Sequence, residues 1–288
     1  MAPSSLQGRN DILVLICSAQ LNVQKAVSEQ LENLGLSYLN IDEYVFAKRA
    51  NEILKCVELL DDEESVETYT EIIECRLTGR LPIERFISSD VYFKMPMFRM
   101  MTDKEVFVDC GAFVGDTVEQ YLFSHGGMFG KIFAFEPDRI NFDAMTARVE
   151  RLNKEWALTA DKIQPINAGV GLTTTKGVIE NHNGLGTNIS EDTNLIGDAI
   201  KIYALGDFFK DQRIDFLKAD IESFELDMLQ GAEKIIRRDM PKIAVCIYHN
   251  SSDIYQILLW LNSLNLGYKF SVRHHSPAYF DTVLYAYQ

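Results

Sequence analysis

The chain has 288 residues and a formal net charge of −14, with 47% hydrophobic and 24% charged residues. This composition is typical of a soluble globular protein, and the length allows one large domain or two smaller ones. The negative charge argues against a nucleic-acid partner, because binding phosphates requires a positively charged surface.

The five cysteines indicate a reducing compartment. None of them has the spacing of a metal site, and an odd number cannot all pair within one chain. The apolar run at residues 12–17 is too short for the core of a signal peptide or for a membrane span. We therefore expect a cytoplasmic protein with no membrane span.

Residues 1–100 form a first, smaller α/β region. A strand is expected at residues 12–17, a helix at 23–34 and a second strand at 37–41, which together make a βαβ start. Asn22 is expected to cap the helix and Gly35 to end it. The first turn of this unit contains no glycine, so nucleotide binding is not expected there.

Two helices are expected to follow, at residues 50–60 and 65–79. The acidic stretch at residues 61–64 reads as the exposed start of the second helix, where the helix dipole favours negative charge. The sequence leaves three roles open for this region: covering an acceptor pocket, forming a homodimer interface, or binding a carrier.

Residues 101–288 alternate strand and helix, which predicts a mostly parallel sheet. Strands are expected at residues 106–108, up to 136, and at 163–168, 214–220, 242–248, 268–272 and 282–287, with helices at 140–152, 224–238 and 253–264. The loop between the last two strands is too short for a parallel crossover, so they should form an antiparallel hairpin. An added strand pair at 176–180 and 199–203 flanks a loop at 182–189 that is suited to cover a site.

The stretch at residues 105–117, Glu-Val-Phe-Val-Asp-Cys-Gly-Ala-Phe-Val-Gly-Asp-Thr, reads as a buried strand that runs into a glycine turn and a helix. Gly111 and Gly115 allow the backbone to approach a ligand closely. The next strand ends in Glu136, about 20 residues further on, where a carboxylate can accept hydrogen bonds from ribose hydroxyls. The alternative is a tight strand–helix turn followed by a solvated acid.

The spacing favours one class of nucleoside. A dinucleotide site needs Gly-x-Gly-x-x-Gly, whereas this turn has Asp109, Gly111, Gly115 and Asp116. Two carboxylates would repel a pyrophosphate, but they suit the ammonium and sulfonium groups of S-adenosylmethionine.

Charged residues gather where the fourth strand ends, at Lys218, Asp220, Glu222 and Glu225. Ligands of open α/β sheets bind at the carboxyl ends of strands, so these side chains are candidates for the site. The alternative is an ion pair of Lys218 with a carboxylate, with Glu225 as an acid in the first turn of a helix. We predict Ser223 as the cap of that helix.

His249 lies at the carboxyl end of the fifth strand and should reach the same crevice. Histidine is suited to accept a proton near neutral pH, although many histidines only form structural hydrogen bonds. No helical ligand spacing supports a metal site, so none is predicted.

Several blocks resemble the FkbM-type methyltransferases. They are Val-Asp-Cys-Gly-Ala-Phe-Val-Gly-Asp-Thr ending at residue 117, Ala-Phe-Glu-Pro-Asp ending at 138, Phe-Leu-Lys-Ala-Asp-Ile-Glu ending at 222, Leu-Gln-Gly-Ala ending at 232, and Tyr-His at 248–249. The resemblance extends from about residue 105 to 287. It departs at Ser223, where the family usually has glycine.

The resemblance implies the sheet of class I, Rossmann-like methyltransferases and S-adenosylmethionine-dependent transfer to a hydroxyl oxygen of a sugar, polysaccharide or secondary metabolite. The acceptor would then be a small molecule or carbohydrate. The cofactor-binding residues implied by position are Asp109, Gly111, Ala112, Gly115, Asp116 and Thr117 around the methionine part, Glu136, Pro137 and Asn141 at the ribose, Asn167 and Ala168 at the adenine, and Asp220 facing the methyl group.

For the chemistry, His249 or Asp220 is the expected general base, and Glu222 would orient the acceptor hydroxyl. Lys218 would tune these carboxylates. Three alternatives remain: a nicotinamide-dependent oxidoreductase, a methyltransferase acting on protein or nucleic acid, and a scaffold that binds the cofactor without catalysis.

Overall fold

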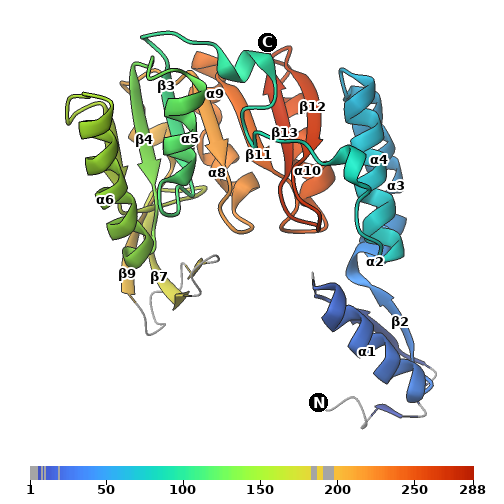
Figure 1. Cartoon of the computed structure of the whole chain (residues 1–288). Helices are drawn as coiled ribbons and strands as arrows, with labels where there is room; N and C mark the ends of the chain where they lie inside the picture. The colour runs from blue at the N-terminus through green and yellow to red at the C-terminus, as the bar shows by residue number, and fades with distance from the viewer. Residues whose placement is uncertain (1–5, 8, 10, 19, 183–186, 191–197) are drawn as a thin grey trace.

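A seven-stranded sheet forms the centre of the computed structural model, which describes residues 6–288 except 8, 10, 19, 183–186 and 191–197 (Figure 1). The strand order is β12-β13-β11-β10-β3-β4-β5. Their bounds are β3 Val106–Cys110, β4 Lys131–Phe135, β5 Ile163–Ile166, β10 Phe216–Ala219, β11 Lys242–Cys246, β12 Lys269–His274 and β13 Thr282–Tyr287. The pairs among β11, β10, β3, β4 and β5 are parallel, while β13 is antiparallel to β11 and β12. The predicted fold class is confirmed.

Helices cover both faces of this sheet, which explains why β3, β10 and β13 are buried at every residue. Successive residues of β3 point to opposite faces: Val106 and Val108 pack with one core cluster, and Phe107 packs with the other. One cluster includes α5 (Asp116–Ser124) and α6 (Arg139–Glu155). The other includes α7 (Leu205–Phe208), α8 (Glu225–Gly231), α9 (Glu233–Asp239) and α10 (Asp253–Ser263).

The first 100 residues divide into an arm and a helical layer (Figure 1). The arm is the predicted βαβ unit, with β1 (Leu13–Ile16) parallel to β2 (Ser37–Asn40) and α1 (Leu21–Asn33) between them. The layer consists of α2 (Ile41–Lys48), α3 (Ala50–Leu59) and α4 (Glu63–Thr78), and α4 packs beside β12. Residues of α4 and α10 belong to the same core cluster. The Tyr69 hydroxyl on α4 also donates to the Ile254 carbonyl on α10 at 3.0 Å. The domain boundary at residue 100 stays a prediction.

Some local predictions were wrong for identifiable reasons. Helix α1 begins at Leu21, so Asn22 lies inside it and does not cap it. The unpredicted α2 begins with a capping box, in which the Asn40 amide donates to Glu43 at 2.7 Å. The expected helix at residues 224–238 is divided into α8 and α9, and Ser223 precedes the N-cap residue Phe224.

A second sheet has the order β6-β9-β7-β8, from β6 (Gly169–Val170), β7 (Thr175–His182), β8 (Thr187–Ser190) and β9 (Asp198–Tyr203). The antiparallel pairing of β7 with β9 confirms the predicted added pair. The tip of the loop that we expected to cover a site, residues 183–186, lies outside the described residues.

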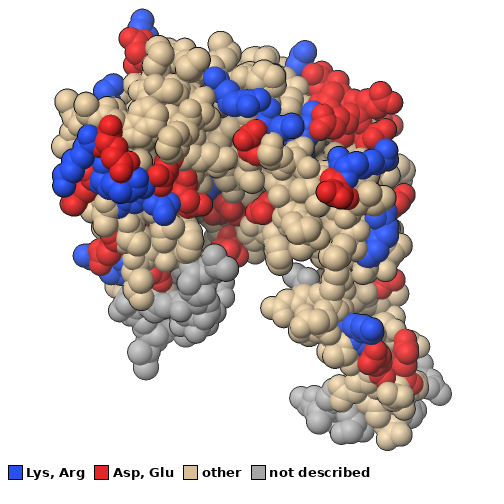
Figure 2. All heavy atoms as spheres, viewed as in Figure 1, with Lys and Arg blue, Asp and Glu red and all other residues tan. Residues whose placement is uncertain are grey.

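Acidic atoms gather over the turn between α3 and α4, as Figure 2 shows. Glu63 and Glu64 are exposed there, and Asp62 caps α4 by accepting from the Ser65 amide at 2.8 Å. This confirms the interpretation of the stretch as an acidic helix start. Within the described ranges, no helix has the length and hydrophobicity needed to cross a membrane.

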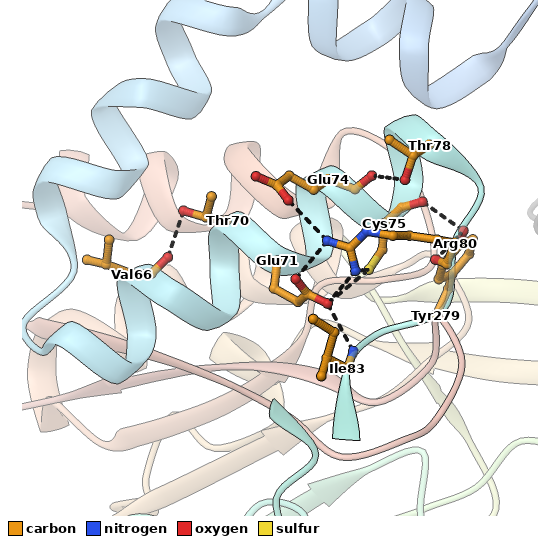
Figure 3. A network of polar contacts seen from close by, with 9 residues as sticks. All are labelled: Val66, Thr70, Glu71, Glu74, Cys75, Thr78, Arg80, Ile83 and Tyr279. Carbon is orange, nitrogen blue, oxygen red and sulfur yellow. Dashed lines mark hydrogen bonds and ion pairs between the residues drawn. The ribbon is translucent and has the colours of Figure 1, made fainter. Parts of the chain in front are cut away.

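A polar network connects the end of α4 with the loop between β12 and β13 (Figure 3). The buried Glu71 accepts from both terminal nitrogens of Arg80, at 2.6 and 2.8 Å, and from the Ile83 amide at 2.9 Å. The Tyr279 hydroxyl donates to the carbonyls of Cys75 and Arg80. The Arg80 guanidinium, opposed by partial burial, lowers the pKa of Glu71 from 4.5 to about 2.

We predict that Glu71→Gln lowers the free energy of unfolding by about 1.5–3 kcal/mol at pH 7, because hydrogen bonds to a charged carboxylate are lost. In the wild type this contribution is fully present above pH 4.5 and is lost as pH falls towards 2, since the folded-state pKa is the lower one. Urea unfolding at pH 7 and pH 3 should therefore show a smaller difference between wild type and variant at pH 3.

Glu155→Gln is the matched control, because Glu155 pairs with Arg151 on the exposed face of α6. It should change the stability by less than about 0.5 kcal/mol. Equal losses in the two variants would contradict a structural role for the buried network.

Candidate functional site

A cavity of about 780 Å³ opens at the carboxyl ends of the central strands. Its volume lies within the range of about 300–1,000 Å³ that is usual for small-molecule sites. Eleven of the predicted residues line it: Gly111, Asp116, Thr117, Glu136, Pro137, Asn141, Ala168, Lys218, Asp220, Glu222 and His249. Four other predicted residues are not part of its described lining: Asp109, Ala112, Gly115 and Asn167.

Lys218 and Asp109 form a buried ion pair at the floor of the cavity. They lie opposite each other on β10 and β3, with Lys218 Nζ 2.9 Å from Asp109 Oδ1. Lys218 Nζ also donates to the Gly111 carbonyl at 2.8 Å. Burial acts to lower the pKa of Lys218, but the charges of Asp109 and Asp220 outweigh it and keep that pKa above its ordinary value. Lys218 is therefore a charged residue paired with a carboxylate, as in the alternative interpretation of this residue, and its role in tuning the neighbouring carboxylates stays a prediction.

The turn after β3 depends on glycine. Gly111 has a φ of +77°, and a Cβ at this position would lie 1.8 Å from the carbonyl oxygen of Asp220. The Asp220 amide in turn donates to the Cys110 carbonyl at 3.1 Å. Gly111 is thus required for the close approach of the two strand ends that carry the site.

Glu136 is held at the end of β4 by backbone amides. Its Oε2 accepts from the Phe113 amide and its Oε1 from the Asp138 amide, both at 2.9 Å. Glu136 is only 5% exposed, which excludes the alternative of a solvated acid. Burial raises its pKa to about 7, although the amides of Asp138 and Phe113 and the side chain of Asn141 act in the opposite direction.

Asn167 supports this strand end from behind. Its side-chain amide donates to the carbonyls of Glu136 and Pro137, both at 2.9 Å. It therefore fixes the course of the chain after β4, and the neighbouring Ala168 is the residue that lines the cavity.

Two tyrosines orient Asp220. Tyr92 donates its hydroxyl proton to Asp220 Oδ2 at 2.7 Å, and Tyr248 donates to Oδ1 at 3.0 Å. Burial acts to raise the pKa of Asp220, but Lys218, His249 and the two hydroxyls lower it below its ordinary value. Asp220 is therefore an ionised carboxylate that faces the cavity.

His249 lies among three carboxylates, which with it form what we call the acidic wall: Asp220, Glu222, Glu225 and His249. Its Nδ1 is 2.9 Å from Glu225, and its Nε2 is 3.4 Å from Asp220 and 3.7 Å from Glu222. Burial acts to lower the pKa of His249, but the three carboxylates, led by Glu225, raise it to about 9. In this arrangement the imidazole is a cation at neutral pH.

Sequence reasoning missed several cavity residues that come from distant segments. Tyr92 belongs to the connection after α4, and Tyr279 and Phe280 belong to the loop between β12 and β13. Asp42 and Arg76, on α2 and α4, form a buried bidentate ion pair, with nitrogen–oxygen distances of 2.8 and 3.0 Å. No local pattern in the sequence marks these residues, because only the tertiary fold brings them to the cavity.

The charged side chains that line the cavity favour a cationic ligand over an anionic one. Among the described lining residues, both Lys218 and Arg76 are already paired with carboxylates, while Asp116, Asp220 and Glu222 also line it. A pyrophosphate would find no unpaired lysine or arginine there. A ligand with a positive charge beside its nucleoside fits these carboxylates better than a pyrophosphate does.

We predict that Ser223→Gly raises the free energy of unfolding by about 1 kcal/mol. Ser223 has a φ of +81°, a left-handed conformation that favours glycine, and it follows Glu222 at +53°. Urea unfolding measures the change. Ser252→Gly is the control, since Ser252 is αR and makes no side-chain capping bond, and it should lower stability by about 0.5–1 kcal/mol. A loss of stability in Ser223→Gly would show that the serine hydroxyl stabilises this turn.

Comparisons with known proteins agree with this geometry. The model of the FkbM methyltransferase domain matches residues 109–270. The crystal structure of methyltransferase FkbM from Methylobacillus flagellatus KT has a TM-score of 0.72 and 23% identity, covering 99% of this chain and 76% of that one. None of the curated proteins matches significantly.

Two further solved structures are less similar. An rRNA methylase from Streptococcus thermophilus has a TM-score of 0.44 at 14% identity, covering 70% of this chain and 99% of that one. Fibrillarin from Aeropyrum pernix, with natively bound S-adenosyl-L-methionine, has a TM-score of 0.39 at 14% identity, with coverages of 65% and 67%. These two likenesses are too weak to bear on the acceptor.

The domain match spans more than half of the residues, and the chain belongs to the FkbM methyltransferase family.

Proposed function

We propose that this protein transfers a methyl group from S-adenosylmethionine to a hydroxyl oxygen of a sugar, polysaccharide or secondary metabolite. One observation carries the proposal: a single cavity joins the amide-held carboxylate of Glu136 with the ionised Asp220 of the acidic wall. The first suits the ribose of a nucleoside, and the second suits a cationic group beside it.

The cofactor would be held mainly by the turn and by the strand end that follows it. Glu136 accepts from two backbone amides and is also bonded by the side chain of Asn141, and an ionised carboxylate, with about four lone-pair sites, has capacity left for the ribose. Asp116 and Thr117 begin α5 at the same cavity, where the carboxylate of Asp116 favours the ammonium of a methionine group. Pro137, Asn141 and Ala168 would border the nucleoside.

S-adenosylmethionine supplies an electrophilic methyl group, which would pass to the acceptor oxygen while the electron pair of the broken bond stays on sulfur. The residues of this chain must align the acceptor and receive its proton. Asp220 and Glu222 present carboxylates to the cavity, and His249 lies between them. The hydroxyl proton would pass to one of these two carboxylates, because the imidazole of His249 already carries its proton.

The alternatives are less consistent with the cavity. An oxidoreductase with a nicotinamide dinucleotide would place a pyrophosphate among these carboxylates, without an unpaired lysine or arginine in the described lining. A nucleic-acid acceptor would face the same repulsion, which the net charge of −14 increases. A scaffold that only binds the cofactor would keep the Glu136 site without a functional acidic wall.

The first experiment is a calorimetric titration of the purified protein with S-adenosylmethionine, with NADH as the matched control. Micromolar binding of S-adenosylmethionine alone supports the proposed cofactor. A folded sample that binds NADH, or neither compound, would overturn it.

Glu136→Gln is expected to weaken S-adenosylmethionine binding about tenfold to hundredfold, because a charged hydrogen-bond acceptor is lost. In the wild type, affinity should rise as pH increases through about 7, since the carboxyl accepts from both ribose hydroxyls only when it is deprotonated. Calorimetry between pH 6 and 8 measures both effects. If the affinity of Glu136→Gln depended on pH as strongly as that of the wild type, the pH dependence would belong to another titratable group.

His249→Ala is expected to slow methyl transfer about 10²–10⁴-fold, because His249 positions Asp220 and Glu222, the carboxylates that would receive the hydroxyl proton, while S-adenosylmethionine affinity should change little. The residue faces Asp220 and Glu222 in the acidic wall and does not contact Glu136. Single-turnover assays with an accepted hydroxyl substrate, together with calorimetry, separate the two effects. A collapse of cofactor affinity would contradict the assignment of His249 to acceptor chemistry.

A further inference from the structure

The acidic wall contains buried polar atoms that the protein itself does not satisfy. Glu225 is 1% exposed; its Oε1 accepts from the Ile221 amide at 2.8 Å. Within the described part of the chain, its Oε2 and both ring nitrogens of His249 are buried and have no partner in hydrogen-bonding geometry. Nδ1 of His249 lies 2.9 Å from Glu225 Oε1, the oxygen that also accepts from the Ile221 amide, so the two side chains meet while Glu225 Oε2 and His249 Nε2 stay without a hydrogen-bond partner among the described residues. Leaving such atoms buried is costly unless something else binds them.

The spacing of these atoms matches a coordination shell. Asp220, Glu225 and His249 each offer one ligand atom, and all of these atoms lie within 4.8 Å of one another. Two ligands on opposite sides of a common divalent ion, each at about 2.0–2.3 Å, are separated by roughly that distance. A single ion between them could contact all three side chains, and its binding would release a ring proton from His249, since only a neutral imidazole is a metal ligand.

The local charge also favours a divalent cation. Three carboxylates lie within 3.7 Å of one imidazole, and like charges gathered this closely favour a cation between them. Asp281 also lines this cavity. The nearby ammonium of Lys218 forms its ion pair with Asp109 and donates to the Gly111 carbonyl, so it does not occupy the space between Asp220, Glu225 and His249.

We infer that Asp220, Glu225 and His249 form a binding site for a divalent cation of the Mn²⁺ or Zn²⁺ class. One imidazole nitrogen and two carboxylates suit these ions better than Mg²⁺, which prefers oxygen ligands and gives up its waters reluctantly. This site departs from the expectation of no metal. The sequence carries no signal for it, because the three ligands follow two different strands and begin α8. No regular spacing in the sequence reveals such a set.

The site deepens the proposed function, on which its role depends. A cation at this place would contact a hydroxyl in the cavity and lower the pKa of that hydroxyl as a Lewis acid. Glu222 lies 3.7 Å from His249 Nε2, and 41% of its side chain is exposed. It would remain as the carboxylate that receives the proton of the hydroxyl.

The test is a titration of the metal-free full-length protein with Mn²⁺, followed by the loss of the free-ion electron paramagnetic resonance signal, and repeated by calorimetry with Zn²⁺. The wild type should bind one equivalent. Glu225→Gln and His249→Gln should each weaken binding at least tenfold, while Glu155→Gln, which alters an exposed carboxylate of α6, should bind as the wild type does. Circular dichroism checks that each variant is folded. If Glu225→Gln does not fold, His249→Gln carries the comparison alone.

Binding of S-adenosylmethionine without metal, measured in the same samples, separates the two proposals. A protein that binds S-adenosylmethionine but neither ion overturns the cation site and leaves the proposed function standing. Equal Mn²⁺ affinity in wild type and both variants also overturns it, because the ion would then be bound elsewhere. One equivalent of ion bound without any S-adenosylmethionine binding supports the site and overturns the proposed cofactor.

Discussion

The site depends on one buried ion pair, between Lys218 of β10 and Asp109 of β3. The two residues are 1% and 0% exposed, and their charged atoms are 2.9 Å apart. Removing either partner would leave the other charge buried and uncompensated, which typically costs about 3–5 kcal/mol. Lys218 Nζ also donates to the carbonyls of Cys110 and Gly111, so it fixes the direction in which the chain leaves β3.

The ends of β3 and β10 are consequently held against each other. Only glycine fits at position 111, because the carbonyl of Asp220 occupies the place of a Cβ. Asp220 is anchored through its backbone to Cys110, and its side chain is turned into the cavity, where Tyr92 and Tyr248 hold it. This is the position between β3 and β10 where the strand order of an open parallel sheet reverses and where such sheets bind ligands.

The first 100 residues take part in the same construction. Tyr92 reaches Asp220 from the connection after α4, and the Asp42–Arg76 ion pair closes part of the cavity. Arg80, Glu71 and Tyr279 join the end of α4 to the loop between β12 and β13, which supplies Phe280 to the lining. The helical layer therefore helps to shape the cavity as well as to cover the edge of the sheet.

The sequence by itself determined the sheet, together with the turn after β3 and the strand end that line one side of the cavity. The alternating apolar strands, Gly111 in its turn and Glu136 at a strand end are local patterns, because backbone geometry and burial impose them on neighbouring residues. The sequence-based prediction failed at α2, whose start is fixed by a capping box, and at Asn22, which lies inside α1. It also failed at Ser223, which has a left-handed backbone and precedes the N-cap residue of α8. Only the tertiary structure decided the partners of the buried charges: Asp109 for Lys218, Tyr92 for Asp220, and Glu225 for His249. These contacts join residues from separate elements, and their energies depend on distance and burial, which appear only once the chain has folded.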